Sequence, residues 1–301
     1  MEIVVFGAGS LGSLVGGALA IDPAHDVTLV ARRAHAEAVA EAGLEIEGEI
    51  DAHVSPAATA DGSALAADLA IVTVKSYDTP TAAETLATGS FDAVLSLQNG
   101  MGNEETLSAR LDVPVLAGVA TCGAILESPG VIRCTGLGKL VLGAREGEPV
   151  ALADRVGQAF VSTPLEAVVA EDMPRRLWEK LAVNAGINAV TALTATENSA
   201  VLERPANEIA RAATRETARI ARADGVILSN REALAAMERV ATETADNTSS
   251  MRQDILAGRR TEIDAINGYV VERADEYGLD VPTNQTLSTL VQTWERGQNL
   301  R

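Results

Sequence analysis

The chain has 301 residues, 47% hydrophobic and 22% charged, which favours a globular protein of two domains and excludes a disordered chain. Its formal net charge of −18 argues against binding to nucleic acid or to an anionic membrane surface, and no apolar run is long enough to predict a membrane span. The N-terminus enters an apolar strand without a basic segment, so we expect no signal peptide and a cytoplasmic protein. The acidic excess and the three lysines resemble the surface of proteins that work in concentrated salt.

The first half of the chain alternates short apolar runs with alanine-rich helical stretches. Strands are expected near residues 3–6, 27–31, 69–74, 93–97 and 115–119. This alternation predicts an α/β domain with a doubly wound, mostly parallel sheet.

Shorter strands follow, and then the strand pattern ends. Runs at 121–126, 131–135 and 139–142 predict an antiparallel meander, followed by a helix near 149–160 and a strand near 167–169. From Met173 onward only helices are expected. We therefore predict two domains, at residues 1–171 and 172–301, with a ligand crevice between an α/β domain and an all-helical one.

A glycine motif directly follows the first strand and opens a helix, which is the context that a dinucleotide-binding turn requires. Its residues are Gly7, Ala8, Gly9, Ser10, Leu11 and Gly12. Gly7 permits the turn, Gly9 admits a pyrophosphate, and Gly12 allows close packing of helix and strand. The alternative is a glycine-rich turn without a ligand. The motif predicts a Rossmann-type domain.

Polar residues follow three of the predicted strands. The second strand ends in Arg32 and Arg33, where an NAD site would have an acidic residue, so a 2′-phosphate and NADP(H) are favoured over NAD(H). One or both arginines could instead be solvated. Lys75 and Asn99 follow later strands at the same sheet edge, where ligands bind, although Asn99 and Gly100 also suit a plain turn.

A polar stripe interrupts an otherwise apolar helix at Lys180, Asn184 and Asn188. Their i, i+4, i+8 spacing places them on one helical face, and such groups inside a protein need partners. The stripe is either a structural network or the lining of a cavity. Because all three histidines lie in the first 53 residues, Lys180 is the best candidate to protonate the oxygen that a hydride transfer leaves negative.

A carboxylate near Lys180 would keep its ammonium charged, and Glu262 is the candidate. Its segment also has a structural interpretation. Ser250 with Gln253, and Thr261 with Asp264, have the spacing of capping boxes. Cys122 and Cys134 lie in apolar contexts without metal-ligand spacing, so buried thiols and no metal site are expected.

Taken together, these motifs resemble the ketopantoate reductases (2-dehydropantoate 2-reductases) over essentially the whole chain. Most specific are the Lys-x-x-x-Asn-x-x-x-Asn run from Lys180, the Ser-Ser-Met run from Ser249 and the Thr-Glu-Ile-Asp run from Thr261. The resemblance implies NADPH-dependent reduction of 2-dehydropantoate to (R)-pantoate, on the route to pantothenate and coenzyme A.

By matching motif, the resemblance also implies residue roles. Lys180 is the proton donor to the C2 oxygen, Glu262 binds the substrate hydroxyl or orients the cofactor, and the substrate is held by Asn184, Asn188, Asn198 and Ser250. Asn99 and the backbone around Ala124 contact the nicotinamide side, with Arg32 on the 2′-phosphate and Lys75 nearby.

Two rival functions stay open. One is reduction of another small 2-oxo acid by a related enzyme, and the other is a non-catalytic NADP(H)-binding regulator, against which the complete polar stripe argues. We expect a small-molecule partner, no nucleic acid and no membrane, and leave a homodimer open.

Overall fold

The computed structural model describes residues 1–146 and 151–301, which form two compact units. Unit 1 comprises Met1–Gln98 and Asn103–Met173, and unit 2 comprises Asn99–Gly102 and Pro174–Arg301. The segment Asn99–Gly102 groups with unit 2, although the sequence pattern placed it in the first domain. The backbone N–H of Met101 donates to the carbonyl of Ala265 at 3.0 Å. No sequence pattern predicts this long-range hydrogen bond.

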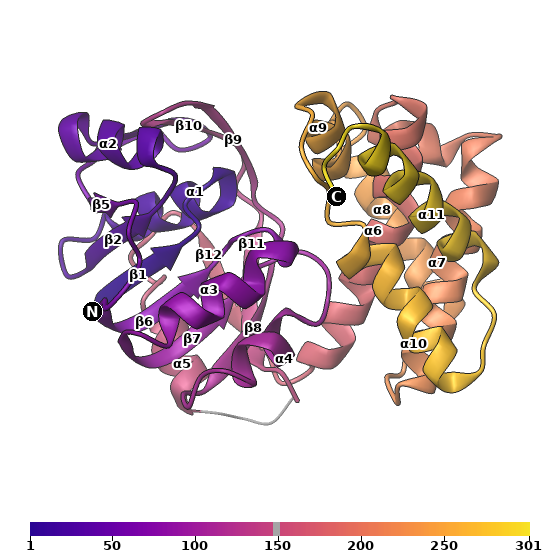
Figure 1. Cartoon of the computed structure of the whole chain (residues 1–301), viewed down its shortest axis with the longest axis horizontal. Coiled ribbons are helices and arrows are strands. Elements are labelled where there is room, and N and C mark those ends of the chain that lie inside the picture. The colour runs from indigo at the N-terminus through magenta and orange to yellow at the C-terminus, as the bar shows by residue number, and fades with distance from the viewer. Residues whose placement is uncertain (147–150) are drawn as a thin grey trace. The chain divides into compact units, whose positions relative to one another are not determined.

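Unit 1 is built on an eight-stranded sheet in the order β12-β11-β8-β7-β6-β1-β2-β5 (Figure 1). The strands are β1 (Glu2–Phe6), β2 (Asp26–Val30), β5 (Ala57–Thr59), β6 (Ala66–Val72), β7 (Ser90–Ser96), β8 (Val115–Ala120), β11 (Lys139–Ala144) and β12 (Glu166–Val169). From β8 to β5 all neighbours are parallel, and the winding reverses between β1 and β6. The prediction of a doubly wound α/β domain is confirmed, and ligands bind such sheets at this reversal point.

Helices cover both faces of this sheet, which explains why its strands read as nearly continuous apolar runs. Ile3 and Val5 face a core that includes α1 (Ser10–Leu19) and α5 (Ala151–Gln158). Val4 and Phe6 point to the opposite core, which includes α3 (Thr79–Leu86) and α4 (Asn103–Ser108). The remaining helical segments are α2 (Arg33–Ala42) and the 3-10 turn η1 (Ser76–Asp78).

A second sheet, in the order β4-β3-β10-β9, corrects the predicted meander. Its strands are β3 (Leu44–Gly48), β4 (Ala52–Val54), β9 (Gly123–Ser128) and β10 (Val131–Gly136). β9 and β10 pair antiparallel as expected, but β11 pairs antiparallel with β8 in the large sheet, because Leu140 and Leu142 are fully buried in its core. β3 and β4, like β5 of the large sheet, were not predicted, since β3 finds its parallel partner β10 more than 80 residues later.

The end of unit 1 matches the sequence pattern where it is described. α5 corresponds to the helix expected near 149–160, of which residues 149 and 150 lie outside the described residues. β12 corresponds to the strand expected near 167–169.

Unit 2 is helical, as predicted (Figure 1). Its elements are α6 (Met173–Thr194), η2 (Asn198–Leu202), α7 (Ala206–Ala223), α8 (Asn230–Glu243), α9 (Ser250–Leu256), the π-helical turn η3 (Asp264–Gly268), α10 (Tyr269–Tyr277) and α11 (Pro282–Gly297). α6 packs closely on α7, since a Cβ at Gly186 would lie 2.4 Å from Thr214 Oγ1. None of the described helices is long and apolar enough to cross a membrane.

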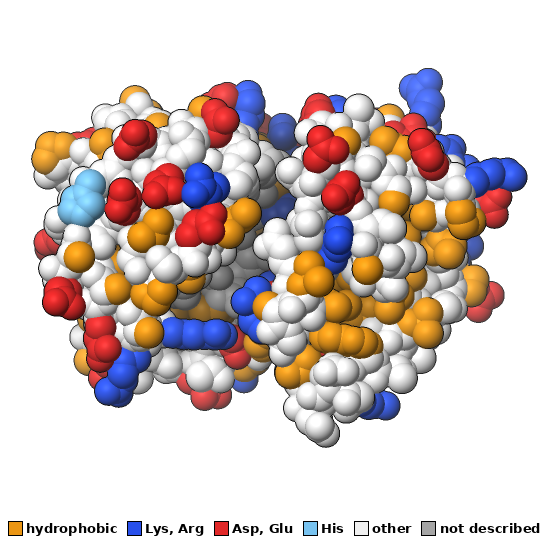
Figure 2. All heavy atoms as spheres, turned by 90° about the horizontal axis from the view of Figure 1, so that it is seen from above, with side chains coloured by type: hydrophobic (Ala, Val, Ile, Leu, Met, Phe, Trp, Pro, Cys, Tyr) orange, Lys and Arg blue, Asp and Glu red, His pale blue; other side chains and the backbone are white. Residues whose placement is uncertain are grey.

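Acidic side chains are spread over the visible face of each unit and do not gather in one patch (Figure 2). Several of them form exposed ion pairs, such as Lys139 with Glu166 and Arg133 with Glu47. The 42 acidic residues outnumber the 24 basic ones by 18, so ion pairing cannot neutralise all of the negative charge.

Candidate active site

The glycine motif forms the turn between β1 and α1, and two of its glycines are enforced by packing. Gly7 has a φ of +99°, and a Cβ there would lie 2.5 Å from Val74 Cγ1. A Cβ at Gly12 would lie 2.4 Å from Thr73 Oγ1, so helix and strand approach more closely than alanine allows. Gly9 differs from both, since a Cβ there would meet only Gly7 O, at 3.9 Å. Gly9 is exposed, and the space beside it is open to a ligand.

The first turn of α1 offers backbone N–H groups to that open space. Gly9 is the N-cap residue and has no side chain with which to cap the helix. Ser10 accepts a hydrogen bond from the N–H of Leu126 in β9 at 3.2 Å, which leaves its own hydroxyl proton able to donate. Ala8 is buried and Leu11 half-buried beneath the turn. Uncapped N–H groups at a helix N-terminus favour an anion such as a pyrophosphate.

Thr73, which the sequence pattern did not single out as a site residue, ties this turn to the end of β6. Its N–H donates to Phe6 O at 2.9 Å, and its hydroxyl donates to Gly7 O at 2.9 Å. Two residues later Lys75 is the N-cap of η1 at the carboxyl edge of the sheet and is half-buried. Ala124 lies in β9, two residues before Leu126, and is also half-buried.

Arg32 and Arg33 follow β2, as the sequence predicted, and both are exposed. Arg32 occupies the N-cap position of α2 with extended backbone, and Arg33 is the first residue of that helix. Arg33 lines a shallow pocket of about 190 Å³ together with the end of β5. No carboxylate follows β2 directly, so two guanidinium groups are the nearest charges in the sequence at this strand end.

Asn99 and Glu262 are brought together, which the sequence could not establish. The Asn99 Nδ2 donates to Glu262 Oε2 at 3.5 Å, a long bond, and Glu262 is only 5% exposed. Gly100, with a φ of +80°, rests on η3, where a Cβ would lie 2.5 Å from the Cβ of Ala265. Just before this segment, Gln98 Nε2 donates to Val74 O at 3.0 Å and to Thr79 Oγ1 at 2.7 Å.

The polar stripe lies on α6 at the predicted spacing. Lys180 and Asn184 are half-buried, and Asn188 is 6% exposed. Within the described part of the chain, neither the Asn184 nor the Asn188 side chain hydrogen-bonds another residue. Neither amide is a fully buried polar group without a partner, so both are accessible to water or a ligand, which favours a ligand site over a structural network.

Asn198 and Ser250 lie near the start of η2 and of α9. Asn198 is 7% exposed; its Nδ2 donates to Thr244 Oγ1 at 2.9 Å, and its Oδ1 is buried with no partner among the described residues. Ser250 is the first residue of α9 and half-buried. The N-cap is Ser249, whose Oγ accepts from the N–H of Arg252 at 3.3 Å and lies 2.7 Å from Thr191 Oγ1.

These bonds correct both capping boxes expected from the sequence. Gln253 Nε2 donates to Thr248 O at 3.0 Å, so it does not cap the helix through Ser250, which stays available for another role. Thr261 bonds Ile263 N and Glu295, as detailed below, and does not pair with Asp264.

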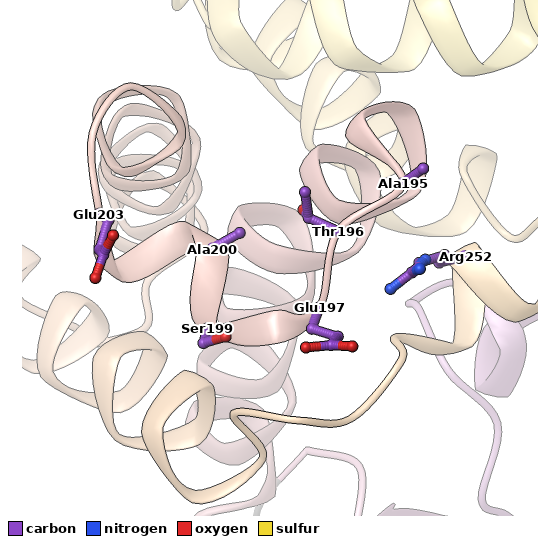
Figure 3. A pocket seen from close by; sticks show the side chains of 7 residues that line it. All are labelled: Ala195, Thr196, Glu197, Ser199, Ala200, Glu203 and Arg252. Atoms are coloured by element: carbon purple, nitrogen blue, oxygen red, sulfur yellow. The ribbon is translucent and has the colours of Figure 1, made fainter.

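A pocket of about 370 Å³ lies beyond the C-terminal end of α6, lined by Ala195, Thr196, Glu197, Ser199, Ala200, Glu203 and Arg252 (Figure 3). The Arg252 guanidinium points into it, with Nε and Nη1 buried and without a partner among the described residues. Ala195 comes 15 residues after Lys180, which corresponds to roughly 22 Å along a helix. A small acid therefore cannot reach both, and two carboxylates in the lining disfavour an anion here.

The histidines serve the fold. His35 is buried between α1, α2 and the β9–β10 turn, accepting at Nδ1 from Gly130 N at 3.0 Å, with Nε2 2.9 Å from Ser13 Oγ. Burial lowers its pKa, which keeps it neutral. His25 and His53 each bond a backbone carbonyl of unit 1 through Nε2. Cys134 is buried, whereas Cys122, expected to be buried, is half-buried because it precedes β9 at the sheet edge; neither forms a disulfide.

A glycine turn at the reversal point of a doubly wound sheet, together with a lysine and amides on a helix of a separate unit, defines the class of two-domain dinucleotide-dependent oxidoreductases. Comparison with protein families narrows this class. The description "Ketopantoate reductase PanE/ApbA" matches residues 3–147, and "Ketopantoate reductase PanE/ApbA C terminal" matches residues 172–295. The chain belongs to the ketopantoate reductase family.

Whole-length relatives agree with this assignment. The 2-dehydropantoate 2-reductase of Halobacterium salinarum is 41% identical, over 98% of this chain and 99% of its own. That of Archaeoglobus fulgidus is 38% identical, over 98% of each chain. Among solved structures, a PanE/ApbA family ketopantoate reductase from Ralstonia eutropha JMP134 has a TM-score of 0.92 at 34% identity, covering 99% and 100% of the two chains. A D-mandelate dehydrogenase complex with NADH also reaches 0.92, at 23% identity, a likeness of fold alone.

Proposed function

We propose that this protein reduces 2-dehydropantoate to (R)-pantoate with NADPH, on the route to pantothenate and coenzyme A. The observation that carries the proposal is the stripe on α6, whose amides have no hydrogen-bond partner among the described residues, in a chain that matches the family over both of its units. We further propose a cytoplasmic location, since neither Cys122 nor Cys134 forms a disulfide, which suits a reducing compartment.

Unit 1 offers a set of groups that fits NADPH. The open space beside Gly9 and the uncapped N-terminus of α1 suit the pyrophosphate, with the Ser10 hydroxyl as a further donor. Arg32 is assigned to the 2′-phosphate and Lys75 to the same sheet edge. When bound, NADPH supplies the hydride that reduces a ketone.

Lys180 is assigned the role of general acid. Reduction forms a C–H bond at C2 of the substrate, and the electron pair of the C=O π bond moves to oxygen, where negative charge develops. The Lys180 ammonium stabilises that charge and donates a proton from Nζ to the oxygen, which yields the alcohol and a neutral amine. Solvent then returns a proton to the amine.

The remaining polar groups are assigned to binding and orientation. Asn184 and Asn188 are donors and acceptors on the same helical face as Lys180, and Asn198 adds a buried Oδ1 that has no partner in the described part of the chain. Ser250 offers a hydroxyl at the start of α9. Glu262 accepts a hydrogen bond from the substrate hydroxyl, and Asn99 and the backbone near Ala124 are assigned to the nicotinamide side.

Steady-state oxidation of NADPH tests the proposal with 2-dehydropantoate, 2-oxoisovalerate and hydroxypyruvate as alternative substrates, each in low and high salt. We expect kcat/KM to be at least about tenfold higher for 2-dehydropantoate, because only this substrate combines a branched carbon with a hydroxyl that the polar groups above would bind. A higher kcat/KM for either of the other two acids would replace the proposed substrate, and no turnover of any would favour a regulator.

A further inference from the structure

Glu262, the residue to which the proposed function assigns the substrate hydroxyl, does not lie in a regular helix. It occupies a bend between α9 and the π-helical turn η3. Its backbone is thus not fixed by the repeating hydrogen bonds of a helix on both sides. π-helical turns inside helical segments occur frequently at functional sites. The orientation of this carboxylate must therefore come from elsewhere.

The residues that flank Glu262 are held from α11. The N–H and the hydroxyl of Thr261 both donate to Glu295 Oε1, each at 2.7 Å. On the other side, Gln292 Nε2 donates to Asp264 Oδ1 at 2.9 Å. Gln292 and Glu295 are three residues apart and so share one face of α11. One helix face holds the chain immediately before and shortly after the carboxylate.

The hydroxyl of Thr261 connects Glu295 with the residue that follows Glu262. This hydroxyl donates to Glu295 and at the same time accepts a hydrogen bond from the N–H of Ile263 at 3.2 Å. The two neighbours of Glu262 are thereby joined to each other through one oxygen atom. Thr261 and Ile263 are almost completely buried, at 1% and 0% exposure, so water does not compete for these bonds.

Glu295 is itself fully buried, at 0% exposure, and its second oxygen accepts from Arg301 Nε. Arg301 also donates to Asp264 Oδ2, to which Arg260 donates as well, at 3.2 Å. A buried carboxylate that accepts from three donors, one of them the Arg301 guanidinium, is a stiff support. Its charge is compensated on the side away from Thr261.

We infer that Glu295 is a positioning residue for the reaction: through Thr261 it sets the orientation of Glu262 toward the substrate. This inference rests on the proposed function. Through Glu295, α11 controls how firmly the substrate hydroxyl is held. This helix carries none of the residues with a proposed catalytic or binding role.

The chain offers a matched control in Glu216. This carboxylate of α7 also accepts bonds from backbone N–H groups of another segment, those of Thr283 at 3.0 Å and Asn284 at 2.9 Å. It supports the start of α11 and also accepts from Asn284 Nδ2 at 2.9 Å, and among the described residues it forms no hydrogen bond with Thr261 or Glu262. Glu216→Gln and Glu295→Gln thus perturb similar supports in the same unit, but only Glu295 hydrogen-bonds a direct neighbour of Glu262, whereas Glu216 reaches η3 only through Asn284 and Asn267.

The test measures kcat and KM for 2-dehydropantoate and the Kd of NADPH for Glu295→Gln, Glu216→Gln, Glu262→Gln and the double variant at 262 and 295. We expect Glu295→Gln to lower kcat/KM about tenfold with the NADPH Kd within about twofold of wild type, and Glu216→Gln to leave both unchanged. The double variant should be no less active than Glu262→Gln alone, since both changes remove the same interaction.

Thr261 keeps the test decisive if Glu295→Gln does not fold. Thr261→Val keeps the shape of the side chain but loses its hydroxyl, and should lower kcat/KM about tenfold. Thr261→Ser keeps the hydroxyl, so its kcat/KM should remain near that of the wild type. Loss of activity in Glu262→Gln but not in Thr261→Val or Glu295→Gln would overturn the inference, as would equal losses in Glu295→Gln and Glu216→Gln. Full activity of Glu262→Gln would instead remove the role that the proposed function gives Glu262.

Discussion

Lys180 is the residue on which the proposed chemistry depends most. We predict that Lys180→Ala lowers kcat at least about 100-fold, in the range expected for the loss of a general acid, with the NADPH Kd changed less than about twofold. Lys139→Ala is the matched control, since Lys139 is an exposed lysine paired with Glu166. Stopped-flow turnover and fluorescence titration of NADPH measure the two quantities. Near wild-type turnover of Lys180→Ala would contradict the acid role.

Arg32 is assigned to the 2′-phosphate, the only group that distinguishes NADPH from NADH. Arg32→Ala should therefore weaken NADPH about tenfold or more and NADH about twofold or less, because a charge-assisted bond to phosphate is lost. Arg33→Ala, a change of the equally exposed neighbour, should affect neither. Equal effects of Arg32→Ala on both nucleotides, measured by titration, would assign the 2′-phosphate elsewhere.

Glu104 makes stability depend on pH. Burial is the main cause that raises the pKa of this carboxyl above its ordinary value of 4.5, and a hydrogen bond from Ser96 opposes the shift. Between pH 4.5 and the raised pKa the folded chain keeps a proton that the unfolded chain releases, so this group's contribution to stability falls as pH rises.

Glu104→Gln removes that titration while keeping the shape of the side chain. The free energy of unfolding of the variant relative to wild type should therefore increase between pH 5 and pH 8, by about 1.4 kcal/mol for each tenfold change in proton affinity. Urea unfolding of both proteins at the two pH values measures this difference. An identical difference at pH 5 and pH 8 would show that Glu104 does not titrate differently in the folded chain.

At the scale of elements, two glycines of the turn between β1 and α1 are expected to have different roles: Gly12 in packing and Gly9 in cofactor binding. A Cβ at Gly12 would lie 2.4 Å from Thr73 Oγ1, so Gly12→Ala should lower the Tm of the cofactor-free protein by several degrees. A Cβ at Gly9 meets no atom closer than 3.9 Å, so Gly9→Ala should keep the Tm but weaken NADPH about tenfold, because the methyl group occupies the space left for the pyrophosphate.

Calorimetry without nucleotide and titration with NADPH distinguish the two variants. Unchanged NADPH affinity in Gly9→Ala would mean that the pyrophosphate does not approach this turn. An unchanged Tm in Gly12→Ala would mean that α1 can shift away from β6 without a loss of stability.

The elements that could be predicted from the sequence are those with a strong local pattern. Five of the six consecutive parallel strands, all but β5, and the helical second half follow from apolar periodicity, and the glycine motif was recognisable because it lies between a strand and a helix. β3 was missed and β11 misplaced because their partners, β10 and β8, are chosen by burial of Leu44, Ile46, Leu140 and Leu142 in cores that form only in three dimensions.

The same limit applies to the candidate site. The spacing of Lys180, Asn184 and Asn188 was visible because one helix carries all three. The bond between Asn99 and Glu262 joins residues 163 positions apart, and the support of Thr261 by Glu295 joins residues 34 apart. The hydrophobic periodicity of a sequence does not indicate which distant residues form such pairs. The N-cap of α9 was misassigned by one residue, because Ser249 and Ser250 are equally good capping residues until Thr191 selects Ser249.

At the scale of the whole molecule, a net charge of −18 opposes the compact state through self-repulsion. Salt shortens the range of this repulsion from about 10 Å at 0.1 M to about 3 Å at 1 M. We therefore predict that the urea midpoint rises between 0.1 M and 1 M NaCl, by the equivalent of about 1 kcal/mol or more in the free energy of unfolding. A midpoint that is constant or falls with salt would mean that surface ion pairs outweigh the repulsion.

The reaction product is the most direct test of the proposed reduction of 2-dehydropantoate. Purified protein incubated with 2-dehydropantoate and NADPH should form (R)-pantoate, identified by chiral chromatography, in an amount equal to the NADPH consumed, because one hydride and one proton convert one ketone to one alcohol. Lys180→Ala, run in parallel, should form almost none over the same time. Consumption of NADPH without pantoate, or formation of the (S) product, would contradict the proposed function.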